Sequence, residues 1–237
     1  MIISILRNYP IGIAIPVALT SVLSVLLSLT VHECSHGLMA YALGDPTAKN
    51  QGRLSLNPLR HLHPVGTLMM LLMGFGWANP VPVNAYYFKN RKRGMALTAL
   101  AGPVSNLILS FFALIFYNLL ATVMVILHQK NPELSISEFA VNLLNVLSLF
   151  LYFLHMMNIN LAIFNLIPVP PLDGSRILFI FLPAEKYFKV MKYEQYIAIG
   201  LIVLLYLGVL DGPLSFITSG ISGVMNLLVG SIFNLFV

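Results

Sequence analysis

The sequence predicts an all-α membrane protein: a polytopic transmembrane helical bundle of about five to six membrane segments, with a short extended or re-entrant insert. Three observations predict this class. Apolar residues make up 58% of the 237 residues and charged residues only 9%, whereas a soluble domain carries roughly 25% charged residues. The mean hydropathy is +0.87. Several apolar stretches also reach the length of about 20 residues that a helix needs to cross a bilayer.

The first predicted elements are a long helix and a short insert. The helix spans about residues 10–43, and the apolar stretch 65–77 follows it. Because that stretch is too short to cross a bilayer as a helix, we expect it to re-enter the membrane or to lie at its surface. Pro80 and Pro82 then favour extended backbone, since proline disfavours helix at its own position and at the one before it.

Four further membrane segments and a charged loop complete the predicted architecture. Long helices are expected over about 94–127 and 137–166. A proline-rich break, a short apolar segment to residue 182 and a charged loop over 184–194 follow them. Two further apolar segments, 195–210 and 214–237, are expected to meet at a tight turn, Asp211-Gly-Pro213. We expect one membrane-embedded domain over residues 1–237. Its core would span about 10–183, and its accessory helices about 195–237.

The distribution of lysine and arginine predicts the orientation. Residues 44–93 contain seven basic residues and 184–194 contain three, whereas Arg7 and Lys130 flank the other membrane ends. Basic residues collect on the cytoplasmic side, so we expect a multi-pass protein of the cell membrane with an outside N-terminus, about five full crossings and an inside C-terminus. The net charge of +5 then needs no nucleic-acid partner, because no basic run with interleaved aromatics stands outside the membrane.

The first predicted helix carries the pattern H-E-x-x-H, as His32-Glu33-Cys34-Ser35-His36. Residues i and i+4 share one helix face, so both imidazoles can reach one metal ion while Glu33 serves as a general base. The alternative is a pair of hydrogen-bonded histidines in a helical bundle. Placement favours the metal site, since charged and imidazole groups inside apolar helices are costly and mark functional sites. At 1.5 Å per residue, His36 lies ~12 Å and His32 ~18 Å from a helix end near Gly44.

A tetrahedral catalytic zinc takes three protein ligands and a water, so two histidines leave one ligand missing. Asp173 is the favoured candidate because it follows the proline-rich break at membrane depth. The other acids are expected elsewhere: Asp45 at the surface, and Asp211 in an outside turn. The alternative for Asp173 is to cap a helix that starts at Gly174.

Four motifs extend the pattern across about residues 30–180: His32-Glu-Cys-Ser-His36, Gly52-Arg-Leu-Ser-Leu-Asn-Pro58 with His61, Ala101-Gly-Pro-Val-Ser-Asn106, and Asn165 through Asp173-Gly174. In this order they resemble the site-2 proteases, which are intramembrane zinc metalloproteases. The resemblance implies one Zn²⁺ per chain held by His32, His36 and Asp173, with Glu33 activating a zinc-bound water. It also implies that Asn165 positions the substrate or stabilises the oxyanion.

The expected function is hydrolysis of peptide bonds in or near transmembrane segments of other membrane proteins, within the lipid bilayer and toward its cytoplasmic side. The alternative is a zinc-binding membrane transporter or channel built from the same intramembrane residues. A protease needs Glu33, whereas a transporter would mostly tolerate glutamine there. An unwound substrate could add as a strand to the extended segment within 65–83. The sequence indicates no oligomeric state.

Two features stay open between two interpretations. His61 and His63 could be metal ligands or could make polar contacts within a loop. A polar stripe on the third long helix could form interhelical hydrogen bonds or could line a path for water or substrate; its members are Asn142, Asn145, Ser148, Tyr152, His155 and Asn158.

Overall fold

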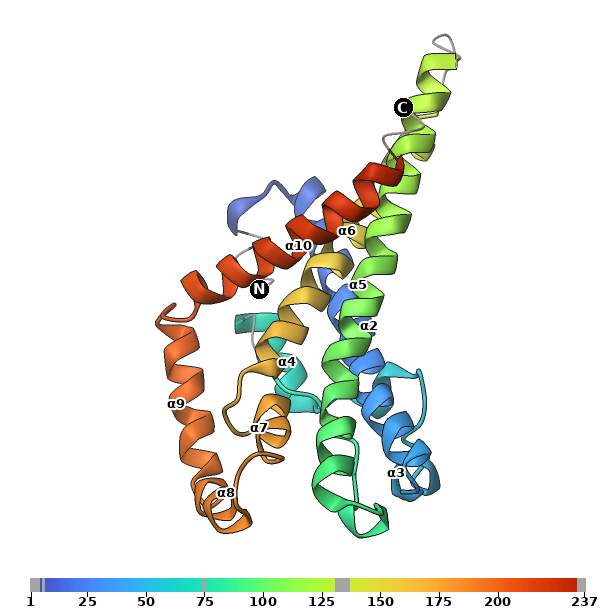
Figure 1. Ribbon diagram of the computed structural model, residues 1–237. Helices are drawn as coiled ribbons and strands as arrows, with labels where there is room; N and C mark the ends of the chain where they lie inside the picture. The colour runs from blue at the N-terminus through green and yellow to red at the C-terminus, as the bar shows by residue number, and fades with distance from the viewer. Residues whose placement is uncertain (1–4, 6, 74–75, 131–136, 234–237) are drawn as a thin grey trace.

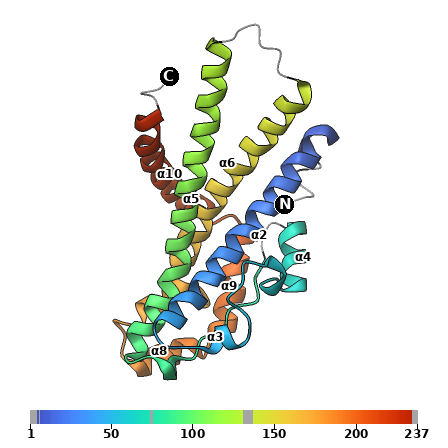
Figure 2. The same ribbon diagram turned by 90° about the vertical axis from the view of Figure 1, so that its right-hand side faces the viewer.

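The computed structural model describes residue 5 and residues 7–73, 76–130 and 137–233. Three long helices pack directly against one another at its centre: α2 (Ile11–Ala42), α5 (Arg91–Lys130) and α6 (Glu138–Leu166) (Figure 1). They lie close together near α7 and α8, while the far ends of α5 and α6 separate (Figure 2). The described residues form no strands, which confirms the predicted all-α class.

A stripe of small and polar residues lets α2 approach its neighbours closely. Thr20, Ser24, Ser28 and His32 follow one another at intervals of four and are all buried. Residues at this spacing share a helix face. The hydroxyls donate hydrogen bonds to backbone carbonyls of the same helix: Ser28, for example, donates to the carbonyl of Ser24 over 2.6 Å. The buried face is therefore small and hydrogen-bonded, as membrane helix interfaces commonly are.

Short helices and extended backbone connect α2 to α5. These elements are α3 (Thr47–Asn50), η1 (Pro58–Arg60), α4 (Pro64–Met73) and η2 (Ala85–Tyr87). With ten residues, α4 is too short to cross a bilayer, in agreement with the predicted insert; residues 74 and 75 of that insert lie outside the described residues. Residues 79–84 are non-helical, as Pro80 and Pro82 predict.

Asp45 is buried, contrary to the expectation of a surface position. One carboxylate oxygen accepts from the Thr47 backbone N–H over 2.9 Å and from its hydroxyl, and the other accepts from the Asn84 N–H over 2.6 Å. The hydrogen bonds offset the cost of burying the charge. Asp45 thereby ties the end of α2 to the end of the extended segment.

The proline-rich break after α6 leads into α7 (Asp173–Leu178) and α8 (Ala184–Met191). Gly174 allows α7 to approach the end of α6, because a Cβ there would collide with the carbonyl oxygens of Leu166 and Ile167. The prediction of a charged loop over 184–194 is wrong, since most of this stretch forms α8. The Tyr187 ring of α8 stacks on Phe179 with ring centroids 3.8 Å apart, a tertiary contact that charge content did not indicate.

The last two helices correct the predicted number of crossings. α9 (Glu194–Tyr206) has 13 residues, about 20 Å of helix, whereas a bilayer core is about 30 Å thick. It ends at Tyr206, and Gly208 just beyond the C-cap has a φ of +70°, the left-handed conformation that commonly terminates helices. Asp211 and Pro213 do not form the predicted turn. They lie in the first turn of α10 (Asp211–Phe233), where proline is tolerated.

Four helices in the described part of the chain are long and apolar enough to cross a membrane: α2, α5, α6 and α10. The prediction of five to six segments is therefore too high. α9 and α10 follow one another away from α8, so that α10 ends in the half of the bundle that contains the far end of α5 (Figures 1 and 2). The described end of α10 therefore lies away from α8, whereas a C-terminus on the side of the basic stretches was expected.

Candidate metal centre

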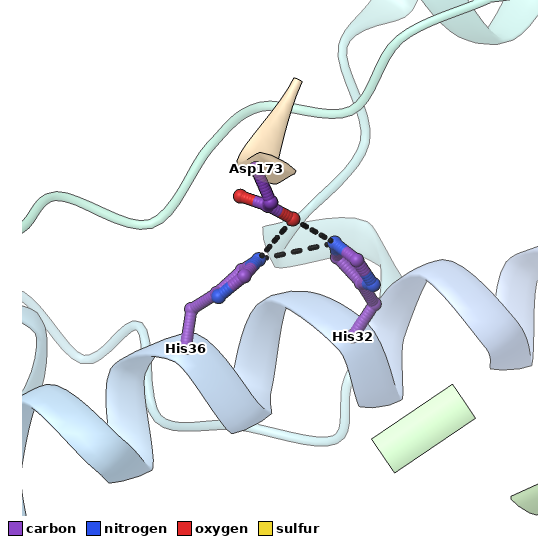
Figure 3. Close-up of side chains that lie close together, drawn as sticks. All are labelled: His32, His36 and Asp173. Atoms are coloured by element: carbon purple, nitrogen blue, oxygen red, sulfur yellow. Dashed lines mark hydrogen bonds and ion pairs between the residues drawn. The ribbon is translucent and has the colours of Figure 1, made fainter. Parts of the chain in front are cut away.

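Three predicted ligands converge between α2 and the start of α7. His32 and His36 rise from one face of α2, and Asp173 points toward them from the first residue of α7 (Figure 3). The Nε2 atoms of the two histidines are 3.0 Å apart, and Asp173 Oδ2 lies 3.1 and 3.2 Å from them. All three side chains are at most 12% exposed. The proline-rich break thus brings the Asp173 carboxylate to His32, which lies 141 residues earlier in the chain.

The other nitrogen of each histidine ring faces a hydrogen-bond acceptor. His36 Nδ1 lies 2.7 Å from the backbone carbonyl of Thr98, and His32 Nδ1 lies 2.5 Å from the side-chain oxygen of Asn106. A carbonyl oxygen only accepts, so each Nδ1 carries a proton, and in the neutral form of each ring the lone pair lies on Nε2.

The three convergent atoms fit a metal ion. Two lone pairs and a carboxylate oxygen within 3.2 Å of one another repel unless positive charge lies among them. A proton on one Nε2 forms a hydrogen bond with only part of this set, whereas a metal cation attracts all three atoms at once. Zinc bonds of 2.0–2.1 Å to nitrogen and oxygen place tetrahedral ligand atoms about 3.3 Å apart, close to the separations found here. The donor set of two imidazoles and one carboxylate is one that catalytic zinc uses.

Helix α5 closes the site through Gly102 and Pro103. A Cβ at Gly102 would stand 2.6 Å from atoms of both His32 and His36, so only glycine fits beneath the rings. Pro103 has no N–H to donate to the carbonyl of Ala99, four residues earlier. The carbonyl of Thr98, in the same turn, accepts from His36.

Glu33 lies next to the ligands in the chain and faces the extended segment. Its side chain is buried, and Oε2 accepts a hydrogen bond from the Val81 N–H over 2.9 Å. The flanking residues Pro80 and Pro82 have no N–H, so within Pro80–Pro82 this is the single backbone donor. The predicted base and the predicted extended segment are therefore in direct contact.

The structure leaves the other candidate residues outside the ligand cluster. Asn165 donates its amide to the Leu161 carbonyl of its own helix over 2.9 Å. His61 Nε2 lies 2.8 Å from the Ser55 carbonyl, and His63 Nδ1 accepts from the Gly66 N–H over 3.2 Å. For both histidines, loop contacts are thus the interpretation that the geometry supports.

Asp173 does not cap a helix that starts at Gly174. It is itself the first residue of α7, and Leu172 occupies the N-cap position without a side-chain hydrogen bond. The cap alternative is therefore wrong. The carboxylate faces the histidines instead, and the Ser175 hydroxyl donates to the Leu172 carbonyl over 2.7 Å.

The polar stripe of α6 divides into two parts. Asn142, Asn145 and Tyr152 are exposed and Ser148 is half-buried, whereas His155 and Asn158 are buried and bonded to other helices. His155 Nε2 lies 3.0 Å from the Ser222 hydroxyl of α10, and Asn158 Oδ1 accepts from Asn106 of α5. Interhelical hydrogen bonding therefore describes the buried part.

No role in the site was predicted for Gly102 or Asn106, although both belong to one of the four motifs. The available signal was their spacing. Gly102 and Asn106 are four residues apart on an apolar helix, and such residues share one face. An asparagine inside an apolar membrane segment is costly enough to indicate a function.

Known proteins resemble this chain over most of its length. The model of peptidase family M50 matches residues 20–207. A Bacillus subtilis protein named "Putative zinc metalloprotease YwhC" is 41% identical over 186 residues, which cover 78% of each chain. A Mycobacterium tuberculosis protein named "Putative zinc metalloprotease Rip2" is 28% identical over 194 residues, which cover 79% of this chain and 66% of the relative. No solved structure matches.

These matches confirm the resemblance that the motifs suggested. The family model spans the H-E-x-x-H helix, the centre of α5 and the Asp173 segment together. The chain belongs to peptidase family M50, the site-2 protease family.

Proposed function

We propose that this chain is a zinc-dependent intramembrane endopeptidase that hydrolyses peptide bonds in or near transmembrane segments of other proteins. The observation that carries the proposal is the buried cluster of His32, His36 and Asp173, two of them on a helix long enough to cross a membrane. Family membership supports peptidase activity, and the names of the relatives support zinc. Glu33 in the same H-E-x-x-H motif supports metal-assisted hydrolysis.

His32, His36 and Asp173 would hold one Zn²⁺ per chain. When bound, zinc would lower the pKa of a water molecule and polarise the scissile carbonyl. The protein contributes the orientation of the ligands: Thr98 and Asn106 fix which nitrogen of each ring is free. Such outer contacts keep imidazole ligands in the correct tautomer and raise their basicity.

Glu33 would act as the general base and then as the general acid. Its Oε2 is held by the Val81 N–H, so the other oxygen can take a proton from the attacking water and pass it to the leaving amine. Burial keeps this carboxylate away from bulk water, which strengthens its interaction with a proton or a developing charge.

The segment 79–84 would receive the substrate. A peptide bond in a helix is hidden from a nucleophile, so the substrate must unwind locally, and an extended partner can hold it by strand addition. The segment is anchored at both ends: Arg53 donates to the Asn79 carbonyl over 2.5 Å, and Asp45 accepts from Asn84. We assign Asn165 to substrate or oxyanion binding, for which its amide would have to leave the Leu161 carbonyl.

We place the protein in the cell membrane as a multi-pass protein, with its site toward the cytoplasm. The two basic stretches lie at one end of the bundle, where α3, the start of α5 and α8 gather (Figures 1 and 2). The contact between Lys92 and the Leu182 carbonyl, 2.8 Å, links these stretches directly. One basic end is what the positive-inside rule requires of a cytoplasmic face.

The test is cleavage in proteoliposomes. The full chain is reconstituted with zinc and a single-span membrane protein of known sequence, and the products are mapped by mass spectrometry. We expect a new terminus within the span or close to it. The Glu33→Gln variant should bind zinc and produce no cleavage, because glutamine cannot accept the proton.

Glu185→Gln, the same change at an exposed glutamate of α8, should cleave as the unmodified chain does. Equal cleavage by Glu33→Gln would contradict the proposal. If that variant also moved zinc across the vesicle membrane, the transporter alternative would replace it.

A further inference from the structure

A buried chain of polar side chains runs from His32 across three helices. His32 Nδ1 lies 2.5 Å from Asn106 Oδ1 on α5, and Asn106 Nδ2 donates to Asn158 Oδ1 on α6 over 2.6 Å. Asn158 Nδ2 then donates to the Ser28 hydroxyl on α2 over 2.9 Å, one turn before His32. Asn106 and Asn158 are both fully buried. The chain therefore closes a ring that begins and ends on α2.

Backbone carbonyls fix the direction of every bond in this ring. Asn158 Nδ2 also donates to the Leu154 carbonyl over 2.7 Å, so its oxygen must face Asn106. Asn106 Nδ2 also donates to the Ser28 carbonyl over 3.2 Å, so its oxygen must face His32. If either amide flipped, donors would face donors and acceptors would face acceptors, and buried hydrogen bonds would be lost. His32 Nδ1 is consequently held as the donor.

The two histidines differ in how this is achieved. His36 donates to a backbone carbonyl, that of Thr98, which every residue type supplies. His32 donates to a side chain, so its tautomer depends on which residue stands at position 106 and, through it, at position 158.

We propose that Asn106 and Asn158 are positioning residues, which hold His32 in the tautomer and orientation that leave Nε2 free to bind zinc. This inference rests on the proposed function and deepens it. Asn106 acts directly on His32, and Asn158 acts only through Asn106. Neither residue touches the substrate or the reacting atoms in this assignment.

The test measures zinc affinity, by competition with a chelator of known affinity, for the full chain in detergent. Asn106→Leu should bind zinc about 10–100-fold more weakly, the usual effect of removing the partner of a metal-bound imidazole. Asn158→Leu should weaken binding less. The double variant should match Asn106→Leu, because two residues that act in series are not additive.

The matched control is Asn118→Leu. Asn118 also lies on α5, but its amide donates to the Leu114 carbonyl of its own helix over 2.9 Å, so zinc affinity should not change. Asn106→Asp keeps an oxygen acceptor for His32 Nδ1 and should retain more affinity than Asn106→Leu. A merely structural role would not produce this order of variants at equal helix content.

A folded Asn106→Leu chain that binds zinc within about twofold of the unmodified chain, a difference of only a few tenths of a kcal/mol, would overturn the inference. If Asn106→Leu does not fold, the decision passes to Asn158→Leu, where a clear loss supports the inference and unchanged binding overturns it. If zinc binds the unmodified chain but not the His36→Ala variant, the proposed zinc site is supported, whatever the result for the two asparagines. If the unmodified chain does not bind zinc, both the proposed function and the positioning role of Asn106 and Asn158 are contradicted.

Discussion

The helices around the histidines are joined by a connected network of buried polar side chains, whereas α10 meets α6 through separate hydrogen bonds such as those of Ser222 and Thr218. Buried polar side chains join α2, α5 and α6, as in the bonds among His32, Asn106 and Asn158. In contrast, α10 buries few of its residues, and an apolar groove of about 700 Å³ lies between it and α5. The groove is lined by side chains such as Phe111 and Val224. Polar groups at membrane depth are costly, so their concentration marks where the protein needs fixed geometry.

The largest expected effect comes from removing a ligand. Asp173→Ala should lower zinc affinity at least about 100-fold, because the roughly 10–16 kcal/mol that bind a protein zinc are shared among three or four ligands. Asp211→Ala removes an exposed aspartate from the first turn of α10 and should leave zinc affinity unchanged. Metal analysis of both purified variants checks this. Retained zinc in Asp173→Ala would show that the ligand set is wrong.

The next effect concerns the space beneath the histidine rings. Gly102→Ala places a Cβ 2.6 Å from ring atoms of His32 and His36, and overpacking of this kind costs about 1–3 kcal/mol. We expect zinc affinity to fall about tenfold or more. Gly220→Ala on α10 meets no atom within 4 Å and serves as the matched control. Chelator competition measures both, and equal affinities would mean that the rings can shift without loss.

A smaller effect is expected where the extended segment is anchored. Asp45→Ala removes the acceptor of Thr47 and Asn84, and buried groups left unpaired cost about 1–3 kcal/mol each. Cleavage should fall about tenfold while zinc affinity stays the same. A parallel loss of zinc would show that this segment supports the ligands rather than the substrate.

The smallest effect belongs to the C-terminal region. The Thr218 hydroxyl of α10 donates to Asn160 Oδ1 of α6 over 2.8 Å, and interhelical hydrogen bonds in membranes average about 0.6 kcal/mol. Thr218→Val should lower the free energy of unfolding in detergent by about that amount, with unchanged zinc affinity and cleavage. A loss of cleavage at full zinc occupancy would assign α10 a role in handling substrate.

The sequence predicted which side chains cluster at His32 better than it predicted the C-terminal helices, for a physical reason. Charged and imidazole groups are rare in apolar helices, so His32, His36 and Asp173 could be selected by cost and elimination before their contacts were known. No such signal distinguishes a short apolar helix from a spanning one. Residues 195–210 are apolar enough to span, but the left-handed Gly208 ends α9 early.

Buried polar contacts between distant segments could not be predicted from the sequence either. Asp45 resembled a loop residue because it follows Gly44 and precedes Pro46, yet Asn84 covers it in the folded protein. The orientation of Asn106 depends on the Ser28 carbonyl and on Asn158, which lie on two other helices. Such partners follow from helix packing and not from local pattern.

We propose that Glu33 performs proton transfer beside a zinc held by His32, His36 and Asp173. The most direct test of this proposal is a paired measurement of zinc content and peptide cleavage on one preparation of Glu33→Gln and one of the unmodified chain. We expect one zinc per chain in both preparations and cleavage only by the unmodified chain. Zinc in both with equal cleavage, or no zinc in the unmodified chain, would contradict it.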